Sequence, residues 1–151
     1  MMKSCFDIFR TAIFAGILIA IAGYGFLAGK SVGMFLFILG LAAVVSYQLK
    51  LYTGTVGFVK VKEIPTLLIV LAGNILGCFL VSLVAKLDTA MDIQSAAQGV
   101  LQSRLALGWW PCGVKAIGCG ILMSVAVHFA RKGKEMGYWI PLVFAVPLFI
   151  H

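Results

Sequence analysis

The sequence predicts an all-α membrane protein, a bundle of apolar helices. Of its 151 residues, 62% are apolar and 11% are charged, and the mean hydropathy is +1.09. Soluble globular domains are about half apolar and about a quarter charged, so this composition indicates a protein that folds in lipid. Apolar stretches of about 20 residues, the length of a helix that crosses a bilayer, recur along the chain. We expect one transmembrane domain over residues 1–151.

Five spans account for these apolar stretches. They are expected at about 11–29, 33–59, 64–85, 107–130 and 138–151, and the fifth is incomplete where the sequence stops. Between the third and fourth spans, a segment rich in Ser, Gln and Ala at 87–104 predicts a loop with a short surface helix.

Positive charges are distributed unequally between the two ends of these spans. If the N-terminus is cytoplasmic, seven lie on the cytoplasmic side, namely Lys3, Arg10, Lys60, Lys62, Arg131, Lys132 and Lys134, against Lys30, Lys86 and Arg104 outside. This is the positive-inside asymmetry of a multi-pass protein of the cytoplasmic (inner) membrane. It also explains the net charge of +7, so the expected partner is the lipid bilayer and not nucleic acid.

Enzymatic and metal-dependent functions are disfavoured by the residue types within the spans. The sequence has neither a carboxylate pair, nor a histidine-rich metal set, nor a serine with a base at usable spacing. The four cysteines are scattered singly, without the paired spacing of a zinc site or a disulfide framework. We therefore expect a protein that is not an enzyme and has no cofactor and no metal.

The second span is too long for one straight helix. At 1.5 Å per residue, residues 51–55 lie about 27–33 Å along it, yet the apolar run ends only at Val59. Non-helical backbone survives in a membrane only when it is buried in protein or lines a watery cavity. We expect an interruption near 51–55, with the Thr53 and Thr55 hydroxyls facing a cavity and Gly54 where the backbone turns tightly.

Lys50 next to this interruption has two interpretations. A lysine at mid-bilayer costs about 2.5–3.5 kcal/mol on insertion scales, which favours a functional role. Alternatively, Lys50 extends to the interface and anchors the topology. Spacing alone leaves both open.

Small residues recur at four-residue spacing in two spans, at Gly16 and Ala20 and at Gly73 and Gly77. Such spacing lets helix backbones approach closely in a bilayer. It indicates helix packing and carries no information on function.

Four stretches, in order, resemble the formate/nitrite transporter family. Segment 40–56, GLAAVVSYQLKLYTGTV, is similar to the family signature in which an acidic residue precedes Leu-Phe-Thr in a loop that interrupts the second helix. GNILG at 73–77 is similar to the third-helix Gly-Asn-Leu-x-Gly, and KAIGCGILMSVAVHFA at 115–130 aligns with the fourth-helix motif without gaps. PLVFAVPLFIH at 141–151 resembles the start of the fifth helix.

The resemblance implies an aquaporin-like helical bundle with interrupted second and fifth helices. Family members have six spans in two inverted halves and form pentamers with one pore per protomer. The chain then stops within the fifth helix, and we expect it to be a fragment of a longer protein. The implied function is a channel or secondary transporter for small monovalent weak-acid anions such as formate or nitrite; the alternative is a membrane structural or assembly subunit.

The same resemblance implies a set of pathway residues. These are Phe37, Leu41, Leu51, Tyr52 and Phe144 at apolar constrictions, Thr53 in the loop, Arg104 at the outer vestibule and His151 at the pore centre. Three positions depart from the family pattern: Lys50 replaces an acid, Gly120 replaces an asparagine, and Ile150 replaces a glutamate.

A proton-linked mechanism follows from these residue types. A bare anion cannot cross a dry ring of Phe37, Leu41 and Phe144, because an unpaired charge in an apolar medium costs too much free energy, so the neutral acid crosses more easily. His151, with an ordinary pKa near 6.5, is the side chain suited to exchange that proton. Without the resemblance, His151 would be taken as a solvated chain end with no role.

Overall fold

The structure, a computed structural model, describes residues 4–87, 93–132, 137 and 139–150, and all of its regular elements there are helical. In chain order they are α1 (Cys5–Ser46), α2 (Tyr52–Val56), the short 3₁₀ helix η1 (Val61–Glu63), α3 (Ile64–Ala85), α4 (Ile93–Leu107), α5 (Trp109–Arg131) and α6 (Trp139–Ile150).

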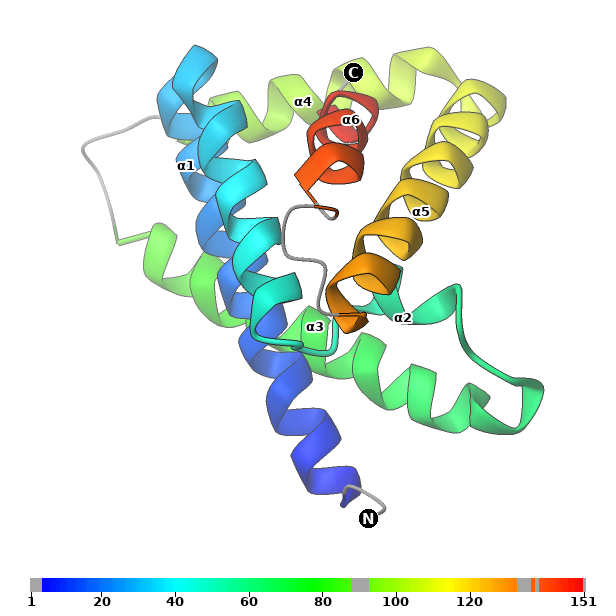
Figure 1. Ribbon diagram of the computed structural model, residues 1–151. Coiled ribbons are helices and arrows are strands. Elements are labelled where there is room, and N and C mark those ends of the chain that lie inside the picture. Colours follow the sequence, from blue (N-terminus) through cyan, green and yellow to red (C-terminus); the bar gives the residue numbers. More distant parts are fainter. Residues whose placement is uncertain (1–3, 88–92, 133–136, 138, 151) are drawn as a thin grey trace.

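Helix α1 is folded back on itself as a hairpin. Its backbone stays helical from Cys5 to Ser46, yet Gly40 lies against Ala22 and the Leu18 carbonyl. In a straight helix, Gly40 and Leu18 would be about 33 Å apart. The axis therefore reverses near residues 29–32, and two arms, 5–29 and 32–46, run side by side (Figure 1).

Three helices are long and apolar enough to cross a membrane. They are the 25-residue arm Cys5–Gly29, the 25-residue stretch Val61–Ala85 and the 23-residue helix Trp109–Arg131. The second arm of α1, Val32–Ser46, is apolar but shorter. Large apolar side chains such as Phe35, Phe79 and Ile117 are exposed on these helices, as expected where the surroundings are lipid. The prediction of an all-α, multi-pass membrane protein is confirmed.

The core lies where the second arm of α1 meets α5 and α6. Helix α6 lies between that arm and α5 and contacts both (Figure 1). The core cluster consists of Ala22, Phe37, Ile38, Leu41, Ala42, Val45, Met123, Ala126 and Leu142. Helix α3 packs on the first arm of α1 and crosses behind it in the view of Figure 1.

Helix α4 and its junction with α5 differ in extent from the expected surface loop. The sequence predicts a short helix within 87–104, whereas α4 has 15 residues and continues to Leu107. Gly108 then adopts a φ of 81°, a left-handed conformation that glycine adopts without steric cost. This residue lets α5 start immediately in a new direction.

Candidate functional site

The second arm of α1 ends in a Schellman motif. The Leu49 N–H donates to the Val44 carbonyl at 3.0 Å, and the Gln48 N–H donates to the Val45 carbonyl at 3.1 Å, which are the two bonds that define this helix end. Gln48 has a φ of 51°, the only positive φ of a non-glycine residue among those described. Glycine usually occupies this position because a Cβ atom is disfavoured there.

The interruption therefore lies earlier than the sequence predicts. Residues 47–51 are outside regular helix, whereas residues 52–56 form the short helix α2. The expectation of a non-helical loop at 51–55 is wrong for 52–55. The physical reason is that the Schellman motif already reverses the chain at Gln48, so Leu51 is extended, with a φ of −93° and a ψ of 132°, and starts a new helix.

Asn74 of α3 satisfies the backbone groups that the interruption exposes. Its Oδ1 accepts from the Tyr52 N–H at 2.8 Å. Its Nδ2 donates to the Lys50 carbonyl at 2.9 Å and to the Ala12 carbonyl of α1 at 2.8 Å. Asn74 is 8% exposed, so all three hydrogen bonds lie inside the protein, where unpaired backbone groups are costly. One side chain thus fixes the backbone on both sides of Leu51.

Close packing of glycines brings Asn74 to the interruption. A Cβ atom at Gly16 of α1 would lie 2.9 Å from the Asn74 Cα atom, and one at Gly77 would lie 2.8 Å from the Ile17 N atom. A Cβ atom at Gly73 would lie 2.7 Å from Ala12 Cβ. The backbones of α1 and α3 therefore touch, as the small-residue spacing predicts.

Helix α2 docks on α5 through two further glycines. A Cβ atom at Gly54 would lie 2.7 Å from the Val127 Cγ2 atom, and one at Gly57 would lie 2.9 Å from the Ser124 Cβ atom. Gly54 is buried within α2. The expectation that Gly54 serves a tight turn is wrong, because the turn lies at Gln48 and Gly54 instead allows close contact with α5.

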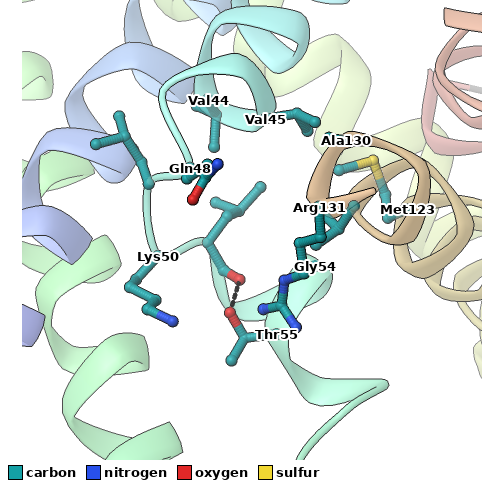
Figure 2. A pocket seen from close by; sticks show the side chains of 12 residues that line it. Val44, Val45, Gln48, Lys50, Gly54, Thr55, Met123, Ala130 and Arg131 are labelled. Atoms are coloured by element: carbon teal, nitrogen blue, oxygen red, sulfur yellow. Dashed lines mark hydrogen bonds between the residues drawn. The ribbon is translucent and has the colours of Figure 1, made fainter. Parts of the chain in front are cut away.

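A cavity of about 80 Å³ lies between the interruption and α5 (Figure 2). Its volume is several times the roughly 10–15 Å³ that one buried water needs. It is lined by Val44, Val45, Gln48, Leu49, Lys50, Leu51, Gly54, Thr55, Met123, Val127, Ala130 and Arg131. Two of these residues are hydrogen-bonded to each other at the start of α2, where the Thr55 hydroxyl donates to the Leu51 carbonyl at 2.7 Å. The sequence predicts that Thr53 and Thr55 both face a cavity. In the structure both belong to α2; Thr55 lines this cavity, whereas the Thr53 side chain is exposed.

The expected constriction residues are only partly brought together. Phe37 and Leu41, each 6% exposed, belong to the core cluster. Leu51 packs against that cluster, while Tyr52 is half-buried next to Asn74. Phe144 of α6 is 63% exposed and is not part of the cluster.

Arg104 lies in the last turn of α4, beside the start of α5, and Gly120 lies at the middle of α5. The Arg104 side chain is half-buried. The Arg104 carbonyl accepts from the Cys112 thiol at 3.4 Å. A Cβ atom at Gly120 would meet nothing within 4 Å, so open space adjoins this position. His151 lies outside the described residues.

Sequence reasoning missed Asn74. The stretch GNILG carries the glycine spacing and part of the family resemblance, but Asn74 itself is assigned no role there, although an amide side chain between glycines in an apolar span is itself a signal. Polar side chains in such helices form hydrogen bonds between helices, because lipid supplies no partner. The partners of Asn74, 22 to 62 residues away, were not readable from the sequence.

Comparison with known proteins decides the family. The sequence matches the family "Formate/nitrite transporter" over residues 1–151. The chain belongs to this family. The suspected relationship is confirmed, and a transport protein rather than an enzyme is established.

The fold of this formate/nitrite transporter family member also matches a solved structure. That structure, described as a pentameric formate channel with formate bound, superposes with a TM-score of 0.74 at 24% identity. The match covers 99% of this chain and 71% of the other. At this identity the similarity shows a shared fold. No functionally curated protein matches the chain.

Proposed function

We propose that the protein conducts small monovalent weak-acid anions, such as formate or nitrite, through a pathway that passes the helix interruption. The observation that carries the proposal is the Asn74 clamp: backbone leaves the helix at 47–51, two hydrogen bonds from the Asn74 side chain hold it at Lys50 and Tyr52, and a third ties Asn74 to the Ala12 carbonyl of α1. A helical bundle with a purely structural role would not need an interrupted helix, because continuous helices satisfy their own backbone hydrogen bonds.

The pathway is proposed to be proton-linked. The buried apolar side chains of Phe37 and Leu41 disfavour a bare charge, so the permeant species at that level is the neutral acid. His151 is the proposed proton donor, and Arg104 the proposed cation that concentrates anions at the outer end. Phe144, Leu51 and Tyr52 are proposed to line the pathway.

The assembly is proposed to be a homo-pentamer in the cytoplasmic membrane. The similar solved channel is described as pentameric, and apolar side chains remain exposed on every long helix. The charge asymmetry supports a cytoplasmic N-terminus. Mass photometry of the purified protein tests the pentamer. Impermeant labelling of single cysteines at positions 95 and 132 tests the orientation, since only position 95 is expected to react on intact cells.

Uptake of labelled formate and nitrite into proteoliposomes tests the function. We expect uptake above that of protein-free liposomes, increasing as the outside pH falls. Thr53, whose side chain is exposed on α2, is proposed to line the pathway and to hydrogen-bond the permeating species. Thr53→Val keeps the volume and removes the hydroxyl, so it should lower uptake by about 2–10-fold, the worth of that one neutral hydrogen bond, without changing assembly. Absence of uptake at every pH would reject the channel and favour a structural or assembly subunit.

A further inference from the structure

The cavity between the interruption and α5 has an unusual charge. Among the twelve described residues that line it, Lys50 and Arg131 are cationic and none is acidic. Gln48 and Thr55 add an amide and a hydroxyl. Figure 2 shows the two cationic side chains on either side of Thr55. An enclosure with two cations and neutral hydrogen-bonding groups favours a single negative charge.

The two cations come from different parts of the fold. Lys50 belongs to the interruption, where Asn74 fixes its backbone carbonyl. Arg131 ends α5, and its guanidinium carbon lies 4.8 Å from the centre of the Phe58 ring, a cation–π contact that restrains the side chain. Phe58 in turn stacks on His128, with ring centres 6.2 Å apart. The backbone of Lys50 and the side chain of Arg131 are thus positioned before any ligand arrives.

The size of the cavity limits the ligand to a small anion. Since one buried water needs roughly 10–15 Å³, a volume of about 80 Å³ accommodates an anion of three or four heavy atoms together with a few water molecules. Phosphorylated metabolites and nucleotides are too large to be enclosed.

We propose that this cavity is a second anion-binding site, at the end of the protein opposite Arg104, and that it takes a small monovalent oxyanion. The inference rests on the proposed function, because the anion assigned to the cavity is the conducted one. By the charge asymmetry this is the cytoplasmic mouth, where bound anion would be held before entering or after leaving the pathway.

Another role for the two cations makes a different prediction. Helices α1 and α5 both end at the cavity, and cations near helix C-termini offset the negative end of the helix dipole. If Lys50 and Arg131 did only this, removing them would lower the thermal stability of the protein without changing its response to anions.

Thermal unfolding of the purified protein in detergent separates the two roles. Sodium formate is titrated against sodium gluconate at equal ionic strength, since gluconate exceeds the cavity. We expect formate to raise the melting temperature saturably. Lys50→Gln and Arg131→Gln should each weaken the apparent affinity about tenfold, as loss of a charged hydrogen bond implies, and Lys50→Glu should abolish the response. Lys132→Gln, next to Arg131 but outside the cavity lining, is the matched control.

Several results would overturn the site. These are a formate response no larger than that of gluconate, or equal formate affinities in the wild type and both glutamine variants. If Lys50→Gln does not fold, the site is tested with Arg131→Gln and Arg131→Lys instead. Arg131→Lys is expected to keep part of the formate affinity, and Arg131→Gln is not. Uptake of formate into proteoliposomes is measured in parallel. Formate binding that depends on Lys50, without any uptake, would reject the proposed channel function but keep the anion site. Uptake without Lys50-dependent binding would reject the anion site alone.

Discussion

The helix interruption is bordered by two contacts that use glycine differently. On the α3 side, Gly16 and Gly77 bring the backbones of α1 and α3 into contact. There the Asn74 side chain accepts a hydrogen bond from the Tyr52 N–H and donates to the Lys50 and Ala12 carbonyls. On the α5 side, Gly54 faces only the tip of Val127, and a polar cavity remains beside it. The first contact holds the interruption in place and the second leaves room for a ligand. A membrane protein can thus keep non-helical backbone by anchoring one face of it and opening the other.

The largest expected effect comes from removing the anchor. Asn74→Leu leaves the Lys50 carbonyl and the Tyr52 N–H without the partner that the structure gives them. Each such buried group costs about 1–3 kcal/mol, so we expect a loss of about 3 kcal/mol in the free energy of unfolding, together with loss of uptake. Denaturant unfolding in detergent measures it, with Ser82→Ala on the exposed face of α3 as control. Wild-type stability in Asn74→Leu would contradict the anchoring role.

The α1–α3 contact itself should tolerate no side chain. Gly16→Ala places a Cβ atom 2.9 Å from the Asn74 Cα atom, and backbone on both sides cannot yield easily. We expect destabilisation by about 1–3 kcal/mol, the usual cost of overpacking. Gly113→Ala on α5 meets nothing within 4 Å and is the matched control, with no destabilisation expected. Equal melting temperatures for the two variants would show that the close contact is not required.

The α2–α5 contact should be more forgiving. In Gly54→Ala the new Cβ atom meets the end of a side chain, Val127 Cγ2 at 2.7 Å, which can rotate or shift. We expect a loss of about 1 kcal/mol, and Val127→Ala in the same protein should recover most of it. A double-mutant cycle by thermal unfolding measures the coupling. Additive effects of the two substitutions would mean that Gly54 does not pack on Val127.

The smallest expected effect is a gain in stability at the helix end. Gln48→Gly relieves the left-handed conformation, φ 51°, and should raise the free energy of unfolding by about 0.5–1 kcal/mol. Gln48→Ala keeps a Cβ atom and is the control, with no gain expected. A greater gain for alanine than for glycine would place this residue outside the left-handed region.

Much of the fold was predictable because hydropathy is a local property. The composition around α3 predicts a span at 64–85, the range over which the helix is found. The hairpin turn of α1 follows from polar residues between two apolar runs. The interruption was predicted one helical turn too late. The length of the span shows that a break must occur but not at which residue, and Gln48 is not a usual residue for a left-handed helix end.

The sequence alone thus determined the lipid environment, the helical class and the family, since each depends on residue types summed along the chain. Tertiary structure decided that Asn74, and not a residue of the interruption, holds Lys50 and Tyr52. It also decided that Thr55, Lys50 and Arg131 share one cavity. The physical reason is that hydrogen-bond partners and enclosed space depend on how closely two helices approach, and glycine backbones distant in sequence set that distance.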